Sequence, residues 1–332
     1  MIDKLHKILG EKVKENIPLK DFTTFKIGGP ARYFFVAESE EEIVKAVKAA
    51  NKLGLEYFIL GGGSNLLVAD EGYEGLVIQV RNSKFEISPN PPLIKGGKGG
   101  FIPNSQHPSP HPSPLKRGRV REGVEIEAGA GVSLQVLVQE AAKAGLSGLE
   151  QATGIPGTLG GAIYGNAGGR YWAMGDAVKS VKLLYPDGKI ESVSHKWLEF
   201  GYRESKLKKF SISERPIILS AVLELKSGNP DEIKKIITEK TAGREQKLPK
   251  EPSSGCAFKN LEDQSVGQLI DSLGLKGKCV GNACVSNLHG NFIVNKGNAA
   301  AKDVKDLIDF IKEAVKKEKG IELEEEIQYL GF

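Results

Sequence analysis

The sequence contains little cysteine, histidine or tryptophan, and these shortages exclude several classes of protein. Its 332 residues include 3 cysteines, 5 histidines and 2 tryptophans. An odd number of cysteines without paired spacing argues against a disulfide scaffold and favours a reducing compartment. Cys279 and Cys284 have no second pair of cysteines or histidines nearby, so the sequence predicts no metal site.

Long apolar runs are also missing. The first residues, MIDKLHKILGEKVKEN, are charged throughout, unlike a secretion signal, and no run reaches the roughly 18–20 residues that span a membrane. The sequence therefore predicts a cytoplasmic protein without a membrane partner. A chain of 332 residues, 40% hydrophobic and 27% charged, is long enough for two or three globular domains.

The positive net charge has a local origin. The whole chain carries +4, whereas residues 90–120 alone contain five lysines and arginines and no acid, which leaves the rest near −1. A nucleic-acid partner is therefore not favoured. Residues 88–120 also hold 8 of the 16 prolines and show no periodicity. We expect a flexible insertion at the tip of a hairpin, with a partner-binding loop as the alternative.

Elsewhere helical and strand patterns alternate, which predicts an α+β protein. Ser39 and Glu42 form a capping-box pattern before a helix that Gly54 ends, and Pro-Asp-Gly at 186–188 predicts a hairpin. We expect three domains: 1–80, 81–227 and 228–332. Further expected elements are helices in 132–145, 231–246 and 301–319, and strands in LEYFIL, GLVIQV, RPIILSAVLELKSG, NFIVN and IELEEEIQYL.

Glycine is abundant and clustered. Three glycine-rich loops cover residues 61–65, 128–131 and 152–169. Glycine lets backbone N–H groups approach a phosphate closely, although a tight turn explains any one such loop equally well. None of the loops fits the Walker or Gly-x-Gly-x-x-Gly patterns. Together they predict a large phosphate-bearing cofactor bound outside the usual dinucleotide motif.

Three further positions suggest chemistry. Arg203, in FGYRES, is either a surface ion-pair partner or a fixed positive charge that stabilises an anion. In a strand, Glu324 and Glu326 would share one face and Glu325 would lie on the other. The three acids are either a solvent-exposed edge, or one carboxyl group points inward and acts as a general acid. Cys256 lies in PSSGCAFKN, where a packed cysteine is the alternative to a functional thiol.

Six motifs occur in the order DFTTFKIGGPA, GGGSNLLVADEGYEGLVI, GLSGLEQATGIPGTLGGAIYGNAGG, FGYRES, SSGCAFKN and GIELEEEIQYLG. Over residues 16–332, apart from the insertion, the chain resembles the UDP-N-acetylenolpyruvoylglucosamine reductase family, in the short form that lacks an extra tyrosine-bearing loop. The resemblance implies a three-domain FAD-binding fold of the vanillyl-alcohol oxidase/p-cresol methylhydroxylase type, with a smaller α+β substrate domain.

The resemblance also implies an activity. NADPH would reduce tightly but non-covalently bound FAD, and the flavin would pass hydride to the enolpyruvyl group, giving UDP-N-acetylmuramate for peptidoglycan. The partners would be these small molecules alone, with the protein a monomer. An FAD-linked oxidase or dehydrogenase, and a flavin- or sugar-nucleotide-binding protein without turnover, are the alternatives.

The family's motifs assign roles to individual positions. Arg203 would stabilise the enolate, Glu326 would be the catalytic glutamate, and Cys256 would protonate the carbanion. We expect Lys259 or Arg203 to lower the pKa of the thiol, so that activity falls at alkaline pH as Cys256 ionises.

The predicted FAD contacts are Gly61, Gly62, Gly63, Ser64, Asn65, Gly129, Gly131, Thr153, Gly154, Ile155, Pro156, Gly157, Gly160, Gly161, Asn166, Ala167 and Gly168. The predicted substrate contacts are Tyr202, Lys247, Lys259, Asn260, Gln268 and His289.

Overall fold

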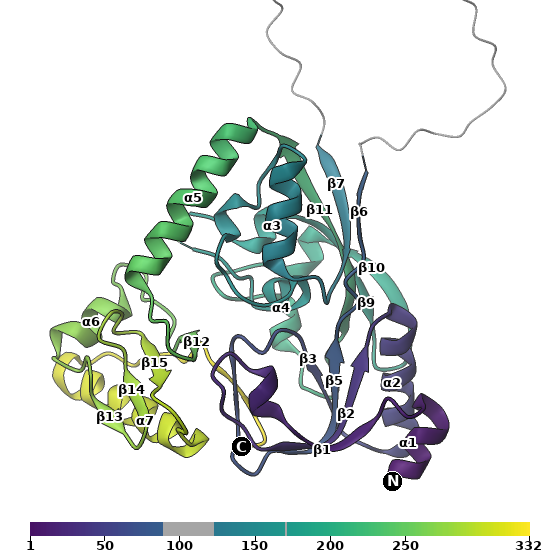
Figure 1. The fold of residues 1–332 in the computed structure, drawn as a ribbon, viewed down its shortest axis with the longest axis horizontal. Coiled ribbons are helices and arrows are strands. Elements are labelled where there is room, and N and C mark those ends of the chain that lie inside the picture. Colours follow the sequence, from purple (N-terminus) through teal and green to yellow (C-terminus); the bar gives the residue numbers. More distant parts are fainter. Residues whose placement is uncertain (89–122, 170) are drawn as a thin grey trace, which may run out of the picture.

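The computed structural model describes residues 1–88, 123–169 and 171–332, so the predicted insertion lies outside the described residues apart from its first position. Three main sheets draw their strands from 14–80, 85–227 and 253–295 (Figure 1). The three-domain division stays a prediction. Residues 1–80, 81–227 and 228–332 are called the N-terminal, middle and C-terminal segments below.

The N-terminal sheet has the strand order β1-β2-β5-β3, with β2, β5 and β3 parallel and β1 antiparallel to β2. The predicted helix after Ser39 is confirmed, because the Ser39 hydroxyl accepts the N–H of Glu42 and Gly54 ends the helix with φ 61°. The elements are α1 (Ile2–Leu9), β1 (Lys14–Pro18), η1 (Leu19–Phe22), β2 (Pro30–Ala37), α2 (Glu40–Leu53), β3 (Tyr57–Leu60), β4 (Leu66–Val68) and β5 (Tyr73–Val80).

The middle sheet is antiparallel, in the order β10-β9-β11-β7-β6. Pairing of β6 with β7 confirms the two strands expected beside the insertion, and β9 and β10 form the expected hairpin. The elements are β6 (Phe85–Ser88), β7 (Val124–Gly129), α3 (Leu134–Lys143), β8 (Leu146–Ser147), η2 (Glu150–Ala152), α4 (Leu159–Tyr164), η3 (Met174–Ala177), β9 (Val178–Leu184), β10 (Ile190–Ser194), η4 (His195–Leu198), η5 (Lys206–Lys209) and β11 (Ile217–Ser227).

One apolar core joins the N-terminal and middle segments. It includes Ile43 and Ile78 from the first and Ile126 and Leu219 from the second, each 0–1% exposed. Burial of side chains of this size stabilises a fold by about 1.5–3 kcal/mol each. The two sheets are therefore fixed against each other, which lets loops from both of them build one wall of a site.

The C-terminal segment has a four-stranded sheet in the order β12-β15-β14-β13 and packs around a second apolar core, to which the N-terminal segment contributes Phe25, Ile27 and Leu67. In Figure 1, α5 leads from the middle segment to this smaller lobe. Pro230 at the first helical turn and the Asn229 side chain, which accepts the N–H of Asp231, start α5 as expected. The elements are α5 (Pro230–Lys247), β12 (Ser253–Cys256), α6 (Val266–Ser272), β13 (Cys279–Val280), β14 (Ala283–Val285), β15 (Phe292–Asn295), α7 (Ala301–Lys319) and β16 (Gln328–Leu330).

The C-terminal segment is attached to the N-terminal segment by backbone pairing and by a helix cap. β16 pairs in parallel with β4. The Asp70 carboxylate accepts the N–H groups of Ala301 and Lys302, at 2.8 and 3.1 Å, at the start of α7. Thr24 donates its hydroxyl to the Ser253 carbonyl at 2.7 Å. These contacts set β12 and the end of the chain beside the glycine-rich loop that follows β3.

Two predictions from the sequence are wrong. Cys279 and Cys284 form a disulfide, because β13 and β14 place them directly opposite each other with Cα atoms 4.1 Å apart. The predicted strand over 321–330 shortens to β16. The acidic residues before it instead pair with the chain beyond Cys256: Glu326 N–H donates to the Ala257 carbonyl, and Lys259 N–H donates to the Glu324 carbonyl, both at 2.8 Å. Among the described residues, no helix combines the length and apolarity needed to cross a membrane.

Candidate active site

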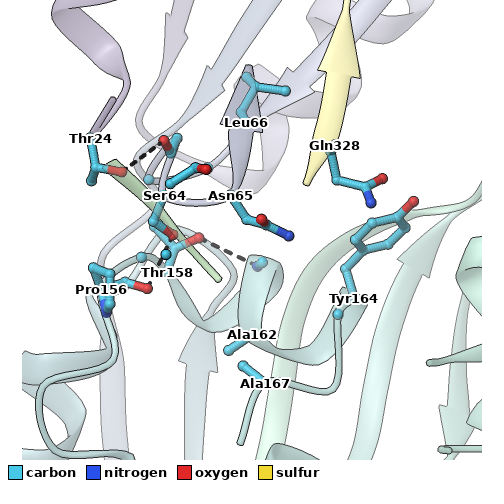
Figure 2. Close-up of a pocket in the computed structure, with 18 of the residues that line it drawn as sticks. Thr24, Ser64, Asn65, Leu66, Pro156, Thr158, Ala162, Tyr164, Ala167 and Gln328 are labelled. Carbon is cyan, nitrogen blue, oxygen red and sulfur yellow. Dashed lines mark hydrogen bonds between the residues drawn. The ribbon is translucent and has the colours of Figure 1, made fainter. Parts of the chain in front are cut away.

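A cavity of about 960 Å³ lies where the three segments meet, at the upper end of the roughly 300–1,000 Å³ typical of small-molecule sites. The N-terminal segment contributes the loop after β3, the middle segment α4 and the loop before it, and the C-terminal segment β12 and the end of the chain. Figure 2 shows residues of the first two groups together with Gln328 from the end of the chain, which is drawn beside Tyr164 of α4.

Two glycine loops pack backbone to backbone in one wall of the cavity. A Cβ atom on Gly62 would lie 2.7 Å from the Gly157 Cα. Gly63 has φ +60°, and a Cβ there would lie 2.0 Å from the Phe22 carbonyl oxygen. Ser64 donates its hydroxyl to the Pro156 carbonyl at 3.1 Å (Figure 2). Side chains larger than hydrogen would therefore force the loops apart, which explains why this stretch is glycine-rich.

Most of the predicted FAD contacts lie in this cavity. The residues that line it are Gly61, Gly62, Gly63, Ser64, Asn65, Gly154, Ile155, Pro156, Gly157, Gly160, Gly161, Ala167 and Gly168. Four predicted contacts do not. Gly129 and Gly131 pack against Asn82, and the Thr153 hydroxyl donates to the Glu150 carbonyl.

The fourth of these residues, Asn166, is buried and supports the loop that carries Arg203. Its amide donates to the Gly201 carbonyl at 2.7 Å, and its side-chain oxygen accepts the N–H of Gly175 at 2.9 Å. Gly201 and Glu204 exchange two backbone hydrogen bonds, at 3.0 and 3.2 Å. Arg203, at the corner of this turn, has φ 56°, which is costly for a large side chain. The surroundings therefore impose the conformation that directs the guanidinium.

Arg203 and Glu326 meet inside the cavity. The Arg203 Nε lies 2.7 Å from the Glu326 Oε1, and the two side chains are 18% and 17% exposed. Burial raises the pKa of Glu326 above its usual value, although the positive charges of Arg203 and Lys208 oppose the shift. The pair therefore combines a permanent cation with a carboxyl group that takes up a proton more readily than an exposed one.

Cys256 ends β12 and lines the same cavity. Burial raises the pKa of its thiol to about 12, helped by the negative charge of Glu326 and opposed by Arg203 and Arg244. The expected lowering of this pKa is therefore wrong. Desolvation outweighs the two arginines, and the Lys259 ammonium is bound to Glu204 and Glu324 instead. The thiol is protonated at neutral pH, as a proton donor must be.

The predicted substrate contacts separate into three groups. His289 lines the large cavity. Tyr202, Lys259 and Asn260 line a second cavity of about 490 Å³ at the boundary between the middle and C-terminal segments. Lys247, at the end of α5, and Gln268, on α6, are exposed and line neither cavity. These substrate roles stay predictions.

The sequence did not point to several basic and aromatic residues in the cavity. They are Lys26, Tyr164, Lys208, Arg215, Arg244, Lys250 and Tyr329. Only Arg244 could have been suspected from the sequence, because it lies one helical turn before Lys247, a predicted substrate contact at the end of α5. Its side chain packs over Gly154, and burial lowers the pKa of its guanidinium. The others come from separate segments that only the fold brings together.

Two family models match parts of this chain. A model described as UDP-N-acetylenolpyruvoylglucosamine reductase, C-terminal domain, matches residues 246–330, and one described as FAD binding domain matches 31–95 and 115–194. The reductase of Caldanaerobacter subterraneus subsp. tengcongensis is 37% identical over 100% of this chain and 98% of its own. The chain belongs to the UDP-N-acetylenolpyruvoylglucosamine reductase family.

Two further relatives support the assignment. The reductase of Lachnoclostridium phytofermentans is 35% identical over 97% of this chain and 94% of its own. The crystal structure of the reductase from Thermus caldophilus superposes with a TM-score of 0.71, at 37% identity, over 95% of this chain and 98% of that one. The expected FAD-binding fold is confirmed, and the protein is an FAD-binding oxidoreductase.

Proposed function

We propose that this protein reduces the enolpyruvyl double bond of UDP-N-acetylenolpyruvoylglucosamine to give UDP-N-acetylmuramate, with NADPH as the reductant. The observation that carries the proposal is the convergence of a buried arginine, a carboxyl group and a protonated thiol on one large cavity. Arg203 comes from the middle segment, and Cys256 and Glu326 come from the C-terminal segment. A cation and a proton donor are what reduction of an enolpyruvyl ether requires, because it generates an enolate.

The residues of the cavity fit FAD. Gly62 and Gly157 bring two backbones so close that no Cβ fits between them, which leaves peptide groups free of side-chain cover along the wall. We assign the loops 61–65 and 154–161 to holding the cofactor. Lys26, Arg215 and Arg244 supply positive charge for phosphate groups of the cofactor and the substrate. Bound there, FAD would take hydride from NADPH and supply it to the terminal alkene carbon.

The remaining chemistry belongs to side chains of this chain. Arg203 stabilises the negative charge that develops on the substrate carboxylate as the enolate forms, because its guanidinium is charged at every working pH. The Cys256 thiol gives its proton to the carbon next to that carboxylate. With a pKa of about 12, the thiolate left behind is a strong base that recovers a proton readily. Glu326 neutralises Arg203 between turnovers and is a second acid beside it.

An anaerobic visible spectrum tests the function. NADPH should bleach the yellow protein, and the enolpyruvyl sugar nucleotide should then restore the colour without oxygen. Recolouring by oxygen alone would favour an oxidase, and a protein that stays colourless after FAD is supplied would contradict the cofactor assignment. Cys256→Ala is the matched variant: it should still bleach with NADPH but recolour about 10²–10⁴ times more slowly with the substrate.

A further inference from the structure

Lys259 lies where the three chain stretches that carry Arg203, Cys256 and Glu326 meet. Its Nζ is 2.6 Å from the Glu204 Oε1 and 2.6 Å from the Glu324 Oε1. Glu204 directly follows Arg203, and Glu324 is two residues before Glu326. Lys259 itself follows Cys256 by three residues. One ammonium group therefore connects all three stretches.

The burial of Lys259 shows that this connection is built into the fold. Its side chain is 11% exposed, against 40% for Glu204 and 70% for Glu324. A buried ammonium is costly unless it is paired, and removal of one partner of such a pair is strongly destabilising. Burial lowers the pKa of Lys259, but the hydrogen bonds that its ammonium donates to the two carboxylates outweigh this effect, and the net shift is upward. The group therefore stays charged over the working pH range.

The turn that carries Arg203 needs such support. Three hydrogen bonds hold it within its own segment: Asn166 to the Gly201 carbonyl, Lys208 to the Arg203 carbonyl and Ser205 to the Tyr164 carbonyl, each at 2.7 Å. These contacts fix the turn's shape but leave its position relative to Cys256 open.

Contacts with the C-terminal segment fix the position of the turn relative to Cys256. Besides the Arg203–Glu326 pair, two contacts tie it to the turn. The Lys259–Glu204 ion pair is one, and the Asn260 N–H, which donates to the Tyr202 hydroxyl at 3.2 Å, is the other. Lys259 pairs with a residue adjacent to Arg203 and, through Glu324, with the stretch that ends at Glu326. It is therefore placed to set the distance between the guanidinium and the thiol.

We propose that Lys259 is a positioning residue that holds the Arg203 turn in register with Cys256 and Glu326, rather than a substrate ligand. It lines the smaller cavity between Tyr202 and Glu324 rather than the large cavity, and both of its carboxylate partners would have to leave before it could bind a phosphate. The inference rests on the proposed function, because the positioning matters only in the step that reduces the sugar nucleotide.

The test compares Lys259→Met, Lys259→Arg and a matched control. Lys182→Met removes a different ion pair between segments, the 2.5 Å contact with Glu40 that joins β9 to α2 away from the cavity. Four quantities are measured for each: flavin content, the Kd of the sugar nucleotide from its perturbation of the flavin spectrum, the rate of bleaching by NADPH, and the rate of recolouring by the substrate.

In Lys259→Met, recolouring should slow about 10–100-fold, because small displacements of catalytic groups cost that much. Kd and the bleaching rate should change less than about 3-fold, because the large cavity is untouched. Lys259→Arg should restore most of the rate, and Lys182→Met should behave like the wild type. Should Lys259→Met not fold, Glu204→Met removes the same contact with the turn, because methionine offers no oxygen to accept from the ammonium, and it should show the same pattern.

The contrary outcomes are distinct. A rise in Kd that matches the loss of rate would make Lys259 a substrate ligand, and an equal loss in Lys182→Met would make the effect a general one of segment contacts. An unaltered recolouring rate in Lys259→Met would also overturn the proposal. A wild-type protein that bleaches but is never recoloured by the sugar nucleotide would instead overturn the proposed function, and the inference with it.

Discussion

The Arg203 Nε lies 2.7 Å from the Glu326 Oε1, and the backbone of Glu326 is held by a third part of the chain. Asn65, in the glycine loop after β3, donates its side-chain amide to the Glu326 carbonyl at 2.8 Å, and its own carbonyl accepts the N–H of Gln328 at 3.1 Å. The ion pair is thus assembled from all three segments, and it lines the cavity only in the folded chain.

Replacement of Arg203 should damage one half of the reaction only. In Arg203→Met, recolouring by the sugar nucleotide should slow about 10²–10³-fold, because loss of one charge-stabilising group costs that much, while bleaching by NADPH persists. In the wild type, the positive charge of Arg203 lowers the pKa of Glu326, but burial raises it by more. Its loss should therefore raise that pKa further and move the Glu326 inflection in the pH–rate profile to higher pH.

Arg203→Lys is the control for charge. It keeps a cation near Glu326 but loses the guanidinium geometry, so its rate should fall while the inflection stays close to that of the wild type. If the inflection in Arg203→Met did not move, the coupling between the two residues would be absent.

The Cys256 thiol should be unusually unreactive. A pKa of about 12 leaves roughly 10⁻⁴ of it as thiolate at pH 8, against about a quarter for a free cysteine with a pKa near 8.5. Because a thiolate of higher pKa is also more nucleophilic, alkylation by iodoacetamide should be about 10² times slower. For the same reason the rate should show no loss from Cys256 ionisation below about pH 10. Mass spectrometry without reductant reports Cys256 alone, since the other two cysteines are bonded to each other.

Glu326→Gln tests the direction in which the charge of Glu326 shifts the pKa of the Cys256 thiol. The negative charge of Glu326 helps to raise the pKa of the thiol, so its removal should lower that pKa and speed alkylation. Rapid labelling of the wild type at pH 8, or slower labelling of Glu326→Gln, would show that burial does not control the thiol.

The sequence is informative where a residue type meets a local backbone demand. Gly54 ends α2 with a positive φ. The alternation rule also predicted the faces of the acidic run: Glu324 and Glu326 contact Lys259 and Arg203, whereas Glu325 turns to Lys312 on α7. Side-chain direction and turn geometry depend on neighbours in the chain, so these features could be predicted.

Features that depend on distant partners could not be predicted. The raised pKa of Cys256 follows from burial by parts of the chain far apart in sequence, so the charges of Arg203 and Lys259 were a poor guide. The Cys279–Cys284 disulfide requires the register of β13 and β14, which the spacing of two cysteines does not give. Arg244 reaches the cavity because α5 crosses Gly154, a tertiary contact that the place of Arg244 one turn before Lys247 does not reveal.

The close contact of the two glycine loops predicts a loss of FAD in Gly62→Ala. The added Cβ would lie 2.7 Å from the Gly157 Cα, a backbone atom that cannot give way alone, so the loops must separate. We expect the affinity for FAD to fall by about 5–30-fold, which corresponds to a cost of about 1–2 kcal/mol, and the flavin content of the purified protein to fall with it. Absorbance at the flavin maximum per mole of protein measures it.

Gly243→Ala is the matched control for this substitution. Gly243 lies within α5, and a Cβ there meets nothing within 4 Å. Alanine should stabilise that helix by about 1 kcal/mol and leave the flavin content unchanged. Equal loss of flavin in both variants would mean that flavin is lost because the protein folds less well, and not because the contact between the two loops is disturbed.

The Asp70 cap should contribute to docking of the C-terminal segment. Ala300, at the N-cap position of α7, has no side-chain oxygen to bind the free N–H groups, so Asp70 supplies the acceptors from another segment. Asp70→Ala should lower the free energy of unfolding by about 1–2 kcal/mol, and Asp70→Asn by less, because one amide oxygen remains to accept. Urea unfolding followed by circular dichroism measures both. An identical midpoint for the wild type and Asp70→Ala would mean that solvent replaces the carboxylate without cost, and that β16 pairing with β4 and the Asn65 hydrogen bond hold Glu326 beside the glycine loop without it.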